Sequence, residues 1–185
     1  MQKEYNVFKI MKTALPLLTL CSLLGIAAGV VLTTYEDTLF ALPGLFILVP
    51  VTIGMGGNIG AILSARTSSA LHLGTIEFRH TSLVFKNNIL ATLIVGMLSF
   101  FLVGVFGHLF SVLIDFGSPG LFEMVLISTI SGILITMMAI IVATLSAFYS
   151  YNNGIDPDDT TIPIVTSICD VFGVLILFGV AMMIV

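Results

Sequence analysis

The sequence predicts an all-α integral membrane protein with five transmembrane helices. Of its 185 residues, 58% are hydrophobic and only 9% are charged, and its mean hydropathy is +1.18. This composition cannot supply the charged surface of a soluble domain or of a nucleic-acid-binding protein. Because about 20 apolar residues cross a bilayer core about 30 Å thick, we divide the chain into five spans: 13–34, 39–63, 84–107, 124–148 and 161–185. We therefore expect one transmembrane domain over residues 1–185, with no soluble regulatory domain.

The first span follows three lysines, as the apolar core of a signal peptide does. Its apolar run of about 20 residues is longer than the 7 to 15 of such a core, so we expect a retained helix. Gly25 and Gly29 form a G-x-x-x-G pattern that allows close helix packing.

The second span has an unusual composition for a membrane helix. It contains one proline, one amide and four glycines: Pro50, Asn58, Gly54, Gly56, Gly57 and Gly60. Such a segment is a poor straight helix, and irregular backbone at membrane depth is tolerated only inside protein or beside a wet cavity. Carbonyl groups freed there could bind a hard cation or its water shell. The alternative is a tight crossing point for another helix.

The third and fourth spans resemble packing helices. Small residues occur at helical spacing in both, namely Gly104 and Gly107 in the third and Ser131, Gly132 and Thr136 in the fourth. Such residues let helix backbones approach each other closely.

The fifth span contains one carboxylate, Asp170, in an otherwise apolar or weakly polar run. A charge at that depth costs about 2.5 to 3.5 kcal/mol on insertion scales, so an ionisable residue there marks an ion or solute pathway by default. Helical spacing places small and polar residues on the same stripe as Asp170, together with Leu177: Pro163, Thr166 or Ser167, and Gly173.

The positions of the basic residues predict the orientation. All six lie before the first span or between the second span and the start of the third: Lys3, Lys9, Lys12, Arg66, Arg79 and Lys86. Because Lys and Arg stay on the cytoplasmic side, we expect a cytoplasmic N-terminus and an outer C-terminus in the cell membrane.

Asn58 and Asp170 are expected at comparable depth. Asn58 lies eight residues before Arg66, about 12 Å along a helix. Asp170 lies eleven residues beyond Asp159, about 16 Å by the same rise.

Oxygen-only donors indicate Mg²⁺, Ca²⁺ or Mn²⁺. One carboxylate is too few for a dry Ca²⁺ cage, whereas Mg²⁺ keeps most of its waters and needs only one or two carboxylates. A pore that presents Asp170 from two copies would suit it. The three histidines, His72, His80 and His108, lack metal-ligand spacing and fit surface positions.

Two motifs resemble a known family. The sequences VPVTIGMGGNIG (49–60) and LSARTSSALHLG (63–74) are similar to the second-helix signature of the MgtE family of magnesium channels and transporters, the latter in the form of its eukaryotic solute-carrier branch. The sequence DPDDTTIPIVTSICDVFG (156–173) resembles the last-helix signature of that family.

The resemblance implies a homodimer in the lipid bilayer, with an ion path formed by the second and fifth spans of both copies. Mg²⁺ would be the transported ion and would be held hydrated by Asp170. Asn58 and Thr166 would line the path beside Asp170, and Asp156 would mark its cytoplasmic mouth. The remaining pore-lining residues would be Gly54, Gly56, Gly57, Gly60, Pro163, Ser167 and Gly173.

Well-known bacterial members carry a cytoplasmic Mg²⁺-sensing region, which this sequence lacks, so feedback gating by such a region is in doubt. A separate regulatory subunit, or the cluster of Asp156, Asp158 and Asp159, could replace it. An equally good interpretation of the cluster is a solvated loop.

Other functions are weighed against ion conduction. A proton- or sodium-coupled carrier of a small solute or another divalent metal also explains a lone membrane carboxylate, although inverted-repeat carriers need two related halves. A structural subunit leaves Asp170 unexplained. An intramembrane aspartyl protease needs two facing aspartates, and no Gly-x-Gly-Asp sequence occurs; we expect no enzyme.

Overall fold

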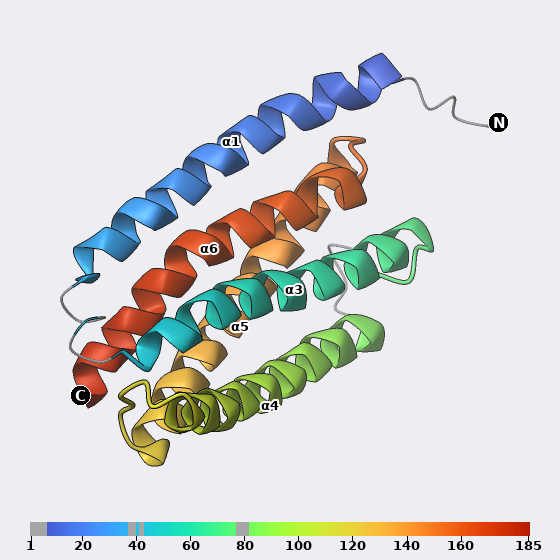
Figure 1. Cartoon of the computed structure of the whole chain (residues 1–185). Coiled ribbons are helices and arrows are strands. Elements are labelled where there is room, and N and C mark those ends of the chain that lie inside the picture. Colours follow the sequence, from blue (N-terminus) through green and yellow to red (C-terminus); the bar gives the residue numbers. More distant parts are fainter. Residues whose placement is uncertain (1–6, 37–39, 41–42, 77–81) are drawn as a thin grey trace.

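The structure is a computed structural model that describes residues 7–36, 40, 43–76 and 82–185. Over these residues it contains five long helices (Figure 1): α1 Val7–Thr34, α3 Leu45–His72, α4 Leu83–Leu113, α5 Leu121–Asn152 and α6 Pro157–Ile184. Each contains a stretch that is long and apolar enough to cross a membrane. The prediction of an all-α protein with five such helices is confirmed.

The second helix differs most from its predicted bounds of 39–63. It begins at Leu45 and continues to His72. Beyond Leu63, its buried residues keep the helical spacing, with Ser64, Thr67, Ser68 and Leu71 all turned inward. Small hydroxyl residues can occupy helix contacts in a membrane, so the polar composition that suggested a loop belongs to a packed helix.

The expected irregularity around Pro50 is also absent from the structure, and that expectation is wrong. α3 is one uninterrupted helix through Pro50 and the four glycines. A helix satisfies its backbone hydrogen bonds internally, which lipid requires, and packing against neighbouring helices overrides weak intrinsic propensity.

Three helices form the centre of the bundle and two lie at its sides. α3, α5 and α6 all pack against one another, α4 packs against α5 and α3, and α1 packs chiefly against α6. Figure 1 shows α1 and α4 on opposite sides of the other three. In the most apolar part of each helix, 44% of the residues of α3, α5 and α6 are buried, but only 22% in α4 and 6% in α1.

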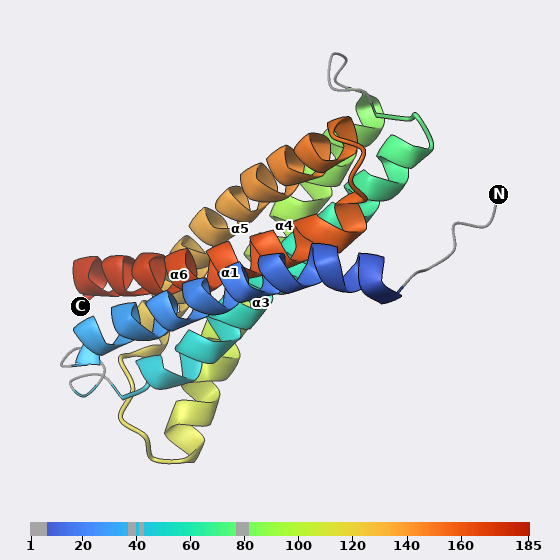
Figure 2. The same cartoon turned by 90° about the horizontal axis from the view of Figure 1, so that it is seen from above.

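The helices alternate in direction. Figure 2 shows the start of α1, the end of α3, the start of α4 and the α5–α6 connection at one end of the bundle; we call this the N-terminal end. The C-terminus and the α4–α5 connection lie at the other end. α3 and α6 are therefore antiparallel neighbours.

Candidate functional site

Asn58 and Asp170 each lie at the midpoint of a helix. In α3, thirteen residues precede Asn58 and fourteen follow it, and the same numbers flank Asp170 in α6. The two helices are antiparallel and in contact, with Gly56 against Cys169 and Gly57 against Thr166, so the two midpoints lie within about one helical turn of each other along the bundle. The sequence prediction of comparable depth agrees with this arrangement.

Three glycines of α3 lie inside helix contacts. A Cβ atom added to Gly57 would lie 3.1 Å from Cγ2 of Thr166 in α6, and one added to Gly56 would lie 2.6 Å from Cγ2 of Ile135 in α5. A Cβ at Gly60 would overlap Cγ1 of Val165. These glycines form what we call the closed face of α3, and the tight helix crossing that the sequence left open is present there. Gly56, Gly57 and Gly60 were expected to line a pore, but in this chain they are buried against α5 and α6.

The opposite side of α3 is uncovered. Gly54 and Asn58, one turn apart, are both exposed, and no atom lies within 4 Å of a Cβ built on Gly54. We call this the open face of α3. In the described part of the chain, no helix covers it.

The stripe predicted around Asp170 is divided between several neighbours. Ser167 and Gly173 are buried, and a Cβ on Gly173 would point toward Ile135 of α5 at 3.9 Å. The Thr166 hydroxyl donates to the carbonyl oxygens of Ile162 and Pro163, both at 3.0 Å. Its hydrogen is therefore used within α6, and only its oxygen remains available to a ligand.

Asp170 itself has no protein partner. The side chain is half-buried, and its carboxylate makes no hydrogen bond or ion pair with any residue that the structure describes. A charge at the middle of a membrane helix is costly unless a partner or water compensates it. A cation, water or a second copy of the chain can compensate it.

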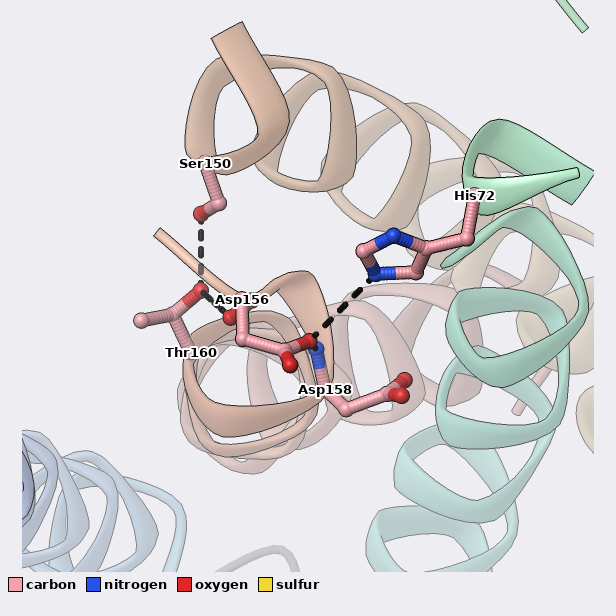
Figure 3. A network of polar contacts seen from close by, with 5 residues as sticks. All are labelled: His72, Ser150, Asp156, Asp158 and Thr160. Carbon is pink, nitrogen blue, oxygen red and sulfur yellow. Dashed lines mark hydrogen bonds and ion pairs between the residues drawn. The ribbon is translucent and has the colours of Figure 1, made fainter. Parts of the chain in front are cut away.

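Asp156 lies far from this centre, at the start of α6, and Figure 3 shows it beside His72 and Asp158. It is the N-cap of α6 and accepts a hydrogen bond from the Asp158 backbone N–H at 3.2 Å. Fourteen residues separate it from Asp170, about 21 Å along a helix. The structure thus does not bring the two carboxylates onto one ion.

Asp156 also connects α6 with α3. Its Oδ1 lies 3.7 Å from Nε2 of His72, the last residue of α3, and the His72 ring packs edge-on against Tyr151 at 5.6 Å between centroids. His72 is exposed, as predicted for a surface histidine. Its contact with Asp156 could not be foreseen because the sequence interpretation ended this helix at 63.

The described residues contain no group of three or more His, Cys, Asp or Glu side chains that could hold a metal ion. Near the level of Asp170, a single chain offers one carboxylate, an amide on an open helix face and the hydroxyl oxygen of Thr166. This donor set suits a cation that keeps most of its own waters. It does not supply a complete dry coordination sphere.

Comparison with known proteins agrees with the two sequence motifs. Residues 49–180 match the MgtE family model, described as a divalent cation transporter. The chain is 32% identical over 165 residues to the magnesium transporter MgtE of Thermus thermophilus, covering 89% of this chain and 34% of that protein. It is 26% identical over 189 residues to solute carrier family 41 member 2 of Xenopus laevis, covering 95% of this chain and 32% of that protein.

The chain therefore spans about a third of the length of these curated relatives. The family match runs from the first turns of α3 to the last turns of α6 and includes both Asn58 and Asp170. Together with five helices that can cross a membrane, this identifies an integral membrane protein. The chain belongs to the MgtE family of divalent cation transporters.

Proposed function

We propose that this protein transports Mg²⁺ across the cell membrane as a homodimer, along a path lined by α3 and α6 of both copies. The observation that carries the proposal is the Asp170 carboxylate, which lies at the midpoint of α6 and has no partner among the described residues of its own chain. The open face of α3 lies within about one helical turn of that level and offers Asn58.

The choice of Mg²⁺ depends on chemistry and on a relative. A carboxylate, an amide and hydroxyl oxygens are hard ligands, and Mg²⁺ commonly binds one or two carboxylates while it keeps its waters. The relative from Thermus thermophilus is named a magnesium transporter. Its ion is thus the natural first candidate for this chain.

The homodimer follows from what one chain lacks. One Asp170 is half of a convincing site for a divalent cation, and two-fold dimers are the commonest closed assemblies. A two-fold axis along the membrane normal would place two Asp170 carboxylates at one depth. It would also cover the open face of α3, which no described helix covers.

Each residue then has a distinct role. Asp170 attracts the cation and accepts hydrogen bonds from its waters, and the Asn58 amide orients that water shell. Gly54 leaves room beside it. The closed-face glycines act indirectly, because they hold α3 and α6 close enough to keep Asn58 level with Asp170.

The orientation completes the proposal. The basic residues Arg66 and Lys86 lie near the N-terminal end of the bundle, which we assign to the cytoplasm. Asp156, Asp158 and Asp159 are exposed at this same end. There they would raise the local cation concentration at the cytoplasmic mouth.

The decisive experiment is Mg²⁺ flux in liposomes that contain the purified chain and an entrapped Mg²⁺ indicator. We expect Asp170→Asn to reduce flux to that of empty liposomes, while Asp158→Asn, which removes an exposed carboxylate from the same helix, leaves most of it. Wild-type flux in a folded Asp170→Asn protein would falsify the proposed path.

The same liposomes test the second candidate, a proton- or sodium-coupled carrier, which a lone membrane carboxylate also favours. Flux that needs only a Mg²⁺ gradient indicates a channel. Flux that stops without a proton or sodium gradient indicates the coupled carrier.

A further inference from the structure

A shallow groove of about 510 Å³ lies between the last turns of α3 and the first turns of α4, at the N-terminal end of the bundle. Its lining includes Arg66, Ser69 and Leu73 from the α3 side and Val84 and Asn88 from α4. We propose that this groove, which we call the Arg66 groove, binds the headgroup of an anionic phospholipid, with the Arg66 guanidinium on its phosphate.

Arg66 lacks a counter-charge in the structure. The side chain is exposed, and no carboxylate among the described residues lies within 4.0 Å of it. Neither wall of the groove can supply one, because α3 and α4 contain no aspartate or glutamate. At this end of α3, the carboxylate of Asp156 contacts His72 and not Arg66.

The depth of Arg66 makes an anion necessary. Arg66 follows Asn58, at the midpoint of α3, by eight residues, which is about 12 Å along the helix. The hydrocarbon core extends about 15 Å from its centre. The Cα of Arg66 would therefore lie just inside the hydrocarbon, where a long basic side chain is stable only if its guanidinium reaches water or a lipid phosphate.

Neutral donors surround the guanidinium. The side chains of Asn88 and Ser69 make no hydrogen bond with other described residues, so both are free to donate to phosphate or ester oxygens. Arg binds phosphate in a bidentate manner, and basic pockets between transmembrane helices are known lipid headgroup sites.

The groove continues into an apolar surface that suits acyl chains. Ile62, one turn before Arg66, and Val95, two turns after Asn88, are 53% and 54% exposed toward the bilayer centre. A free phosphate ion would use only the polar end, whereas a phospholipid uses both parts.

Native mass spectrometry of the purified full chain, incubated with phosphatidylglycerol or phosphatidylcholine, tests the inference. We expect tighter retention of phosphatidylglycerol and a loss of about fivefold in its affinity on Arg66→Gln, as expected for one basic residue near the surface. Lys12→Gln is the matched control, because Lys12 is also exposed and lies near the start of α1 at the same end. It should change the affinity less than Arg66→Gln does, because Lys12 does not line the groove.

Further measurements distinguish an anionic lipid from other occupants of the Arg66 groove. Val84→Trp keeps the Arg66 charge but fills the groove, so it should also weaken phosphatidylglycerol binding. This variant still tests the inference if the Arg66→Gln protein does not fold. Excess inorganic phosphate should not displace the lipid. Equal losses of affinity in the Arg66 and Lys12 variants, or displacement of the lipid by phosphate, would overturn the inference. So would an Arg66→Gln protein that loses the dimer but binds the lipid unchanged, because a second copy would then occupy the groove. None of these measurements depends on the transported ion.

Discussion

The two faces of α3 carry similar small residues in opposite surroundings. On the closed face, Gly56, Gly57 and Gly60 meet side chains of α5 and α6 so closely that an added methyl group would displace them. On the open face, Gly54 has no atom within 4 Å of an added Cβ, and Asn58 is exposed. A glycine-rich helix in a membrane can thus hold the fold on one side and leave room on the other.

Replacing a glycine of α3 by a larger residue should therefore have a different effect on each face, although the glycines look equivalent in the sequence. A larger residue on the closed face must move α3 away from α6, which changes stability first. A larger residue on the open face changes only what lies beside the helix, which we propose to be the hydrated ion. Stability and flux should therefore separate between the two faces.

The largest expected effect is on the closed face at Gly60. Its added Cβ meets Val165, which is fully buried and, as a β-branched residue in a helix, stiff in χ1. We expect Gly60→Val to destabilise the protein by about 1–3 kcal/mol, measured as loss of the folded, monodisperse fraction on heating in detergent. The double variant with Val165→Ala should recover part of the loss, and no recovery would contradict the assigned contact.

Asn58 should have the next largest effect, on ion selection. Asn58→Ala removes an exposed amide from the open face, so we expect a normal folded fraction but weaker discrimination of Mg²⁺ from Ca²⁺ and monovalent ions in liposomes. Asn87→Ala, which removes an exposed amide from α4, is the matched control and should leave the ion ratios unchanged. Unchanged ratios in both variants would remove Asn58 from the path.

A smaller effect is expected from alanine at Gly54 and Gly57, a pair that tests the two faces directly. Gly54→Ala should leave stability unchanged or raise it by up to about 1 kcal/mol, because alanine favours the helix, while it lowers Mg²⁺ flux. Gly57→Ala should lower stability, since its Cβ meets Thr166 at 3.1 Å. If both variants lose stability to the same extent, the distinction between the faces fails.

The smallest effect concerns the contact of α3 with α6 outside the closed face. His72 and Asp156 have side chains 52% and 45% exposed, and exposed pairs contribute only about 0–1 kcal/mol. His72→Ala should therefore shift the thermal midpoint slightly, and less than Gly57→Ala does. A larger shift would mean that this end, and not the closed face, holds the two helices together.

Much of the fold could be predicted because a bilayer fixes the length of a helix and because small residues mark packing surfaces. The end of α3 could not, since Ser64, Thr67 and Ser68 look like loop residues until a partner helix buries them. Asp170 was found by its charge alone. Which glycines face α6 depends on the rotation of α3 in the bundle, and one sequence does not contain that information. From the sequence, Arg66 served to predict orientation and depth, because the absence of a neighbouring carboxylate among the described residues is a property of the tertiary structure.

The isolation of α1 has a consequence for biosynthesis. Of the five helices α1 leaves the ribosome first and α6 last, with 122 residues between them, yet α6 is its main partner. α1 must therefore wait in the lipid as a single helix. It is suited to this, because Ala14–Thr34 contains no charged residue and the hydroxyls of Thr19 and Ser22 donate to its own carbonyl oxygens at 2.8 and 2.9 Å.

α6 is the opposite case. Its carboxylate makes solitary insertion expensive, but by the time α6 emerges the other four helices are already in place to receive it. α1, which is stable in lipid as a single helix, is synthesised first, and α6, which is not, is synthesised after its neighbours. On the path that we propose, a nascent chain therefore has no complete ion pathway until its synthesis has passed Asp170.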